Sequence, residues 1–262
     1  MKNIDIKSLA LNLLYFIISI LLLVGLWDMV SRLSKNEVPS PADTLIVFKE
    51  VFQNPFQNDP DYTGIGTKLM SSLARVGIGF GLGSLVAIPL GFLMGASKPV
   101  MKIMNPIVQF LKPVSPLAWF PLGLAIFKDS PQASIFMIFI CSLWPTLINT
   151  AFGVSNISQD YKNVGKAYGF SNWTYITKIM FPYSLPNIVT GLRLSVGIAW
   201  MVIVAGEMLS GGIGLGYFIW DEGFNGGSIG KILVAIIIIG FVGVVLDKIF
   251  MALQNVFAWE KK

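Results

Sequence analysis

The segment NVGKAYGFSNWTYITKIMFP, residues 163–182, is amphipathic although it lies between two long apolar spans. Apolar residues recur at helical spacing in residues 164–168 and again in residues 173–180. Gly169 interrupts the pattern, Ser171 is placed to cap a second helix, and Pro182 is expected to end that helix. The sequence predicts two short helices joined at a glycine at a membrane surface, suited to docking a partner. A plain amphipathic connector between spans is the alternative.

The composition around this segment is that of a membrane protein. Of 262 residues, 54% are hydrophobic and 13% are charged, whereas soluble domains carry about 25% charged residues. We therefore predict an all-α polytopic membrane bundle that forms a single domain over residues 1–262. The net charge of +5 is explained by lysines that flank apolar spans. Nucleic-acid binding is not expected, because no basic run is interleaved with aromatic residues.

Several kinds of chemistry are excluded by the residues present. The chain has no histidine and one cysteine, so histidine triads, histidine metal sites and an intrachain disulfide are ruled out. Cys141 lies in an apolar run and is expected to be a small core residue. Residues 226–232, GGSIGKI, lack the glycine spacing and the Ser/Thr of a phosphate-binding loop. The chain is therefore expected to be a transport protein and not an enzyme, and any ATP hydrolysis must belong to another chain.

Apolar runs of membrane-spanning length predict about six transmembrane helices. The predicted spans are residues 9–30, 68–95, 103–127, 133–152, 187–209 and 229–250. A signal peptide is the alternative for the first span, but no small-residue cleavage site follows it. The connection 31–66 is predicted to be an outer loop with a short helix near residues 43–52. Residues 211–228 are read as a glycine-rich polar loop.

The third span is not expected to be one straight helix. Prolines and Lys112 interrupt residues 103–127, and broken backbone at membrane depth is tolerated where protein or a water-filled cavity satisfies it. This span is therefore our candidate for lining a pathway. In the second span, glycine pairs at 77/81, 79/83 and 91/95 predict close helix packing.

Six spans place both termini on one side of the membrane. Lysines gather in the segments that would then share the side of the N-terminus, and the positive-inside rule assigns that side to the cytoplasm. These lysines are Lys2, Lys7, Lys98, Lys102, Lys162, Lys166, Lys178, Lys248, Lys261 and Lys262. The segment 163–182 is then also cytoplasmic.

Ionisable residues inside predicted spans are candidates for function, because they are costly in lipid. Four such residues are Arg75, Lys112, Arg193 and Glu207. Structural pairing is favoured for Arg75 and Arg193. Lys112 lies beside Ser115 and Trp119, where a cation and a hydroxyl can face a passing anion. Glu207 is a candidate either to gate the pathway or to pin residues 211–214.

The segment 158–182 resembles the cytoplasmic coupling loop of ABC-importer permeases, whose pattern is E-A-A, three residues, G, nine residues, I-x-L-P. Gly169 is followed after nine residues by Ile179 and then by Pro182. The chain departs from the pattern at Asn163, Val164, Gly165 and Phe181, and the helix–glycine–helix form is retained. The resemblance implies that an ATPase is gripped by a set of residues in this loop. The set is Asn163, Val164, Gly165, Ala167, Gly169, Ile179 and Pro182.

Most of the chain is similar to permeases of the nitrate/sulfonate/taurine/bicarbonate group. The resemblance is carried by residues 72–80, 111–129, 143–154, 163–170, 185–209 and 211–221. Two of these, LKPVSPLAWFPLGLAIFKD (111–129) and GLGYFIWD (214–221), are most similar to the nitrate and bicarbonate branch.

This resemblance implies a type I importer permease in a bacterial inner membrane, surrounded by lipid and paired with a second copy of itself. It also implies cytoplasmic ATPase subunits that carry ATP and Mg, and a periplasmic or lipid-anchored solute-binding protein. Nitrate is the first choice of substrate, and bicarbonate, cyanate or an alkanesulfonate such as taurine are alternatives. An ion-coupled secondary transporter is the alternative from another class, but the sequence shows no repeated halves.

Overall fold

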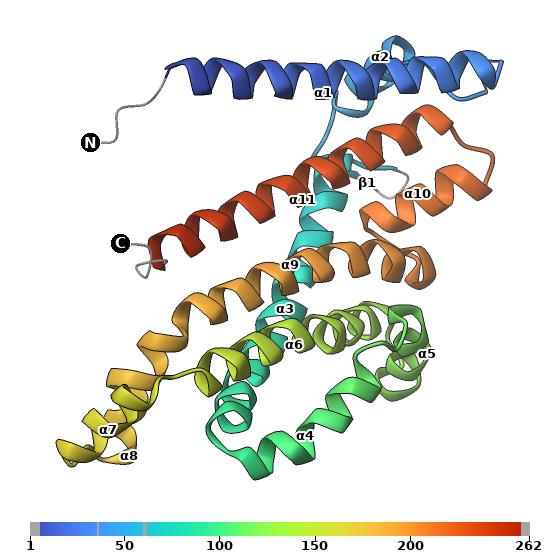
Figure 1. Cartoon of the computed structure of the whole chain (residues 1–262). Helices are drawn as coiled ribbons and strands as arrows, with labels where there is room; N and C mark the ends of the chain where they lie inside the picture. The colour runs from blue at the N-terminus through green and yellow to red at the C-terminus, as the bar shows by residue number, and fades with distance from the viewer. Residues whose placement is uncertain (1–5, 36, 60–61, 258–262) are drawn as a thin grey trace.

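A computed structural model of the chain describes residues 6–35, 37–59 and 62–257, and this part is almost entirely helical. Lys2, Lys261 and Lys262, which contributed to the predicted orientation, and both chain ends lie outside the described residues. The helices and strands follow one another from α1 to α11 (Figure 1). Their bounds are α1 Ile6–Leu33, α2 Pro41–Val51, β1 Asn58–Asp59, β2 Tyr62–Thr63, α3 Ile65–Ala96, α4 Lys98–Leu111, α5 Pro116–Phe127, α6 Ser130–Ser155, α7 Gln159–Ala167, α8 Asn172–Tyr175, the π-helix η1 Ile176–Met180, α9 Phe181–Ser210, α10 Leu215–Phe224 and α11 Ile229–Phe257.

The predicted membrane bundle is confirmed. Within the described residues, five helical segments are long and apolar enough to cross a membrane, and α4 with α5 makes a possible sixth. The axes of α4 and α5 are bent by 98°, so the third span is broken, as its prolines predicted. Pro106 and Pro121 lie inside the two helices, whereas the break itself falls between Leu111 and Pro116.

Helix α6 forms the centre of the bundle, with its most extensive contacts to α3 and α9. Glycines of α3 let the α6 backbone approach closely. A Cβ at Gly79 or Gly91 would lie within 3 Å of atoms of α6, whereas one at Gly77 or Gly81 would meet nothing within 4 Å. The 79/83 and 91/95 pairs therefore pack inside the chain, and the 77/81 pair lies on an open face.

Helix α1 lies at the edge of the bundle. The apolar part of this helix is not buried against the rest of the chain. Its end is tied to the following loop by Trp27 Nε1, which donates to the Pro39 carbonyl at 3.0 Å, and by Ser31 Oγ, which donates to the Val38 carbonyl at 2.8 Å. An apolar helix that the other described residues leave uncovered suits a hydrocarbon environment.

The connections between spans contain more structure than the sequence predicted. The expected helix near 43–52 is α2, which begins at Pro41 after a capping box between Ser40 and Asp43. The stretch 211–228 was read as a loop, but it contains α10. The helix forms there because Gly211 and Gly212 adopt positive φ and turn the chain sharply after α9.

The two ends of the bundle are distinct. In Figure 1 the start of α1, the end of α11 and the α7–α8 segment lie toward the left, and the α1–α2 link, α10 and the α5–α6 link lie toward the right. The chain therefore brings the α7–α8 segment to the same end of the bundle as the outermost turns of its first and last helices.

Candidate functional site

The coupling loop, residues 158–182, has the predicted helix–glycine–helix form. Gly169 lies between α7 and α8 with a φ of +63°, a conformation that a residue with a side chain adopts at a cost. Ser171 caps α8, and its hydroxyl accepts from the Thr174 N–H at 3.2 Å.

The prediction that Pro182 ends the second helix is wrong. The helix continues from α8 through η1 into α9, and Pro182 lies in the first turn of α9. In η1 the Phe181 N–H donates to the Ile176 carbonyl five residues earlier. This wider turn accommodates a proline ring and its missing N–H within a continuous helical path. The coupling loop is therefore joined directly to the long helix α9.

The coupling loop is anchored to the bundle by one small apolar cluster. Ile179 and Met180 are buried there with Val154 from the end of α6 and Ile157 from the connection that follows it. A Cβ at Gly165 would lie 2.8 Å from the Tyr175 ring, so α7 and the second helix are in close contact.

The rest of the loop is open. Asn163 and Ala167 are exposed, and the apolar side chains of Val164, Tyr168 and Trp173 are exposed by 43%, 76% and 73%. A loop that shows this much apolar surface next to its anchor has the character of an interaction site.

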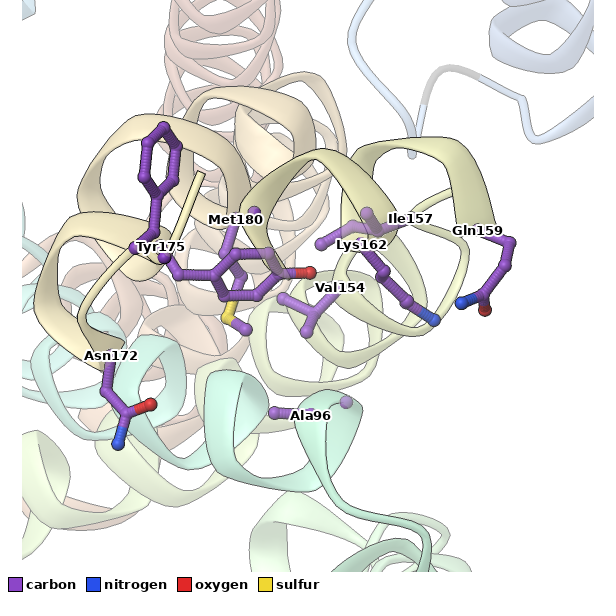
Figure 2. Close-up of a pocket in the computed structure, with 12 residues that line it drawn as sticks. Ala96, Val154, Ile157, Gln159, Lys162, Asn172, Tyr175 and Met180 are labelled. Atoms are coloured by element: carbon purple, nitrogen blue, oxygen red, sulfur yellow. The ribbon is translucent and has the colours of Figure 1, made fainter. Parts of the chain in front are cut away.

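A cavity of about 690 Å³ opens between the coupling loop and the ends of α3 and α6. Figure 2 shows the Tyr175 ring lying across this cavity, with Gln159 and Asn172 at opposite sides and Ala96 below. The cavity is lined by Gly95, Ala96, Val154, Ile157, Gln159, Lys162, Gly165, Gly169, Phe170, Asn172, Tyr175 and Met180.

A second, smaller cavity of about 140 Å³ lies at the break between α4 and α5. It contains Lys112, as the broken span suggested, but Ser115 and Trp119 are not among its lining residues. Ser115 is exposed, and Trp119 packs against the main apolar core. The remaining lining residues are Val114, Pro116, Cys141, Trp144, Pro145 and Ile198.

Arg75 and Glu207 form a buried ion pair between α3 and α9. Arg75 Nη1 lies 2.9 Å from Glu207 Oε1, and the Glu207 side chain is fully buried. Ser72 Oγ lies 2.8 Å from both carboxylate oxygens, and the Gly216 N–H donates to Oε2 at 3.0 Å. Glu207 therefore holds the start of α10 against α3, close to the residues 211–214 that it was predicted to pin.

Arg193 is also paired with a carboxylate. Its guanidinium donates twice to Asp247 of α11, at 2.6 and 2.8 Å. Arg193 Nη1 also donates to Gln254 at 3.3 Å. Lys112 takes part in none of the ion pairs formed within the described residues.

The sequence reasoning did not identify two partners in these networks. Asp247 directly follows the apolar run of the last span, and this position is the available sequence signal for a partner to Arg193. Ser72 carried no signal, because one serine in a glycine-rich span resembles a small packing residue.

Comparison with known proteins assigns the family. Residues 87–258 match the family described as binding-protein-dependent transport system inner membrane component. The chain belongs to this family. It is a permease subunit of an ABC importer, spans the membrane several times, and by its family works with an ATPase and a solute-binding protein.

Similar members of this permease family are known from cyanobacteria. The nitrate import permease protein NrtB of Synechocystis is 38% identical over 91% of this chain and 86% of that protein. The bicarbonate transport system permease protein CmpB of Synechococcus elongatus is 36% identical over 88% of this chain and 84% of that protein. A solved structure of the MetNI methionine ABC transporter, in an inward-facing conformation, has a TM-score of 0.62 at 15% identity. The match covers 73% of this chain and 94% of the MetNI chain, and it supports a shared fold.

Proposed function

We propose that this permease imports a small inorganic anion, with nitrate as the first choice. The observation that carries the proposal is the similarity to NrtB over 239 residues at 38% identity. Bicarbonate is the second candidate, because CmpB is similar over 234 residues at 36% identity. Cyanate and alkanesulfonates such as taurine remain further alternatives. An ion-coupled secondary transporter is disfavoured, because the permease family works with an ATPase.

The proposed assembly contains a second copy of this chain, cytoplasmic ATPase subunits, and a periplasmic or lipid-anchored solute-binding protein. ATP and Mg belong to the ATPase in this proposal. The permease would lie in a bacterial inner membrane with the coupling loop and both termini in the cytoplasm. The lysines near these segments and the shared end of the bundle in Figure 1 support this orientation.

The coupling loop is the proposed contact with the ATPase. Its exposed apolar side chains would be covered by the partner, while the buried Ile179 transfers movement to the bundle. Gly165 and Gly169 shape the loop, Asn163, Val164 and Ala167 present the α7 surface, and Pro182 continues the loop into α9. Because α9 is unbroken from Phe181 to Ser210, a displacement of the loop would reach the far side of the membrane through one helix.

The proposed pathway residues have different roles. Lys112 at the broken span would face the anion, with Ser115 and Trp119 on the neighbouring turn of α5. Arg75, Glu207 and Arg193 would hold the helices that surround the pathway, because each has a charged partner within the chain.

Purification with the ATPase tests the coupling loop. Gly169→Val is expected to lose the co-purifying ATPase, because a β-branched residue is strained at positive φ. Gly169→Asn is the matched control, because asparagine tolerates this conformation. Equal ATPase recovery with both variants would contradict the assignment.

Uptake by cells tests the substrate. In a strain that lacks this chain, restoring it is expected to restore uptake of labelled nitrate more than uptake of labelled bicarbonate, cyanate or taurine. A larger gain for another of these substrates would replace nitrate in the proposal.

A further inference from the structure

The cavity at the break between α4 and α5 is lined by Lys112, whose ammonium group forms no ion pair with a carboxylate of the described residues. Three of its lining residues come from the break or the start of α5, three from α6 and one from α9. Lys112 is the charged residue among them, and no acidic side chain lines this cavity. The ion pairs of the described residues use Arg75 and Arg193 but not Lys112. Lys112 is itself exposed, so an anion can reach its ammonium group and pair with it without displacing a carboxylate.

The remaining walls are mostly apolar. They consist of the Trp144 ring, the Cys141 thiol and the aliphatic side chains of Val114, Ile198 and two prolines. Lys112 is exposed on its other side, but the apolar walls lower the effective dielectric constant on the cavity side and strengthen charge interactions there relative to bulk water. A site with one ammonium group favours an anion with one negative charge over an anion with two.

The size of the cavity also limits the ligand. Its volume is about 140 Å³, whereas a single water needs on the order of 10–15 Å³ of such space. An oxyanion of four or five atoms fits together with a few waters, and a large organic anion does not.

We propose that this cavity is a binding site for one small monovalent oxyanion, nitrate or bicarbonate, paired with Lys112 and enclosed by Trp144, Pro145 and Ile198. The inference rests on the proposed import of a small inorganic anion and adds the place where that anion rests within the permease. It also assigns part of the site to α6 and α9, away from Ser115 and Trp119.

The single cysteine of the chain allows a direct test, because Cys141 lines the cavity. The purified permease with its ATPase is treated with iodoacetate or with neutral iodoacetamide, two alkylating reagents of similar size, and the modification of Cys141 is followed by mass spectrometry. A substitution can also change the reactivity of the Cys141 thiol. Because such a change affects both reagents equally, it cancels in the ratio of the two rates. Lys112→Met is expected to lower the iodoacetate-to-iodoacetamide ratio by at least about threefold through loss of the nearby charge. Lys102→Met, on the exposed surface of α4, is the matched control and is expected to leave the ratio unchanged.

The ligand is tested in the same assay with sodium nitrate and sodium bicarbonate in separate arms. The anion that binds is expected to slow alkylation by iodoacetate in the unchanged chain and not in Lys112→Met. If neither reagent reaches Cys141, equilibrium dialysis of labelled nitrate and of labelled bicarbonate decides, and Lys112→Met is expected to bind the anion at least about threefold more weakly than Lys102→Met.

Equal rate ratios in the two lysine variants, or equal anion binding where the thiol is unreactive, would overturn the site. This result is distinguishable from failure of the proposed function. Normal nitrate uptake by Lys112→Met would leave the importer standing without this site. Protection by bicarbonate in a chain that does not restore nitrate uptake would keep the site and change the substrate.

Discussion

The hydroxyl of Ser195 in α9 lies 2.8 Å from the hydroxyl of Thr146 in α6 and also bonds to two backbone groups of α6. The Thr146 N–H donates to Ser195 Oγ at 3.2 Å, and Ser195 Oγ donates to the Ser142 carbonyl at 2.5 Å. In a regular helix the Thr146 N–H would bond directly to the Ser142 carbonyl. A side chain of α9 thus bonds to both backbone groups of this helical step, next to Pro145, which has no backbone N–H to donate within α6.

Removing this hydroxyl is expected to destabilise the permease. Ser195→Ala leaves the Thr146 N–H and the Ser142 carbonyl without their bridging partner in a buried position, which costs about 1–3 kcal/mol. The measurement is the midpoint of thermal unfolding in detergent. Ser155→Ala is the control, because the Ser155 hydroxyl bonds to the Phe152 carbonyl in an exposed position, and little change is expected.

A second substitution separates the bridge from general packing. In a Pro145→Ala background, α6 regains the backbone N–H that proline lacks and can relax around Thr146, so Ser195→Ala should cost less than in the unchanged chain. An equal cost in both backgrounds would show that the contribution of the Ser195 hydroxyl does not depend on the proline in α6.

The ion pair between Arg75 and Glu207 gives a second prediction. Arg75→Met leaves a fully buried carboxylate without its cation, and the free energy of unfolding is expected to fall by about 3–5 kcal/mol. Changing both residues to methionine should recover part of this loss, because no unpaired charge then remains. Chemical unfolding of the detergent-solubilised protein measures both values.

The control for this pair lies on α1. Arg32 and Asp28 also form an ion pair, at 2.8 Å, but their side chains are 78% and 40% exposed. Arg32→Met is therefore expected to change stability by less than about 1 kcal/mol. A similar loss at Arg32 and Arg75 would mean that the burial of Glu207 does not control the effect.

The glycines of α3 give a third prediction. A Cβ at Gly91 would lie 2.8 Å from the Leu147 carbonyl oxygen, which is backbone and cannot rotate away. Gly91→Ala is expected to cost about 1–3 kcal/mol through overpacking. Gly81→Ala meets nothing within 4 Å and is expected to leave stability unchanged or to raise it by up to about 1 kcal/mol, because alanine favours the helix. The unfolding midpoints of the two variants test this difference, and equal losses would contradict it.

Local features of the coupling loop were predictable from the sequence, with one exception. Gly169 and Ser171 act where they were placed, because a left-handed turn and a helix cap each depend on one residue and its nearest neighbours. The exception is Pro182. A proline normally disfavours a preceding helix, but here the π-helix η1 precedes it and the helical path continues. That wider turn is held in place by the buried contacts of Ile179 and Met180, which are tertiary.

The sequence by itself determined the membrane class, the break in the third span, the helix–glycine–helix loop and the family resemblance. These features follow from hydropathy, proline positions and motif spacing, which are properties of short stretches of chain. Only the tertiary structure decided that Arg75 pairs with Glu207, 132 residues away, that Gly91 packs and Gly81 does not, and that Ser195 bonds to the α6 backbone. The physical reason is that a membrane helix is apolar on nearly all sides, so its sequence does not indicate which face meets another helix. The rotation and register of α3, α6 and α9 against one another bring these residues together.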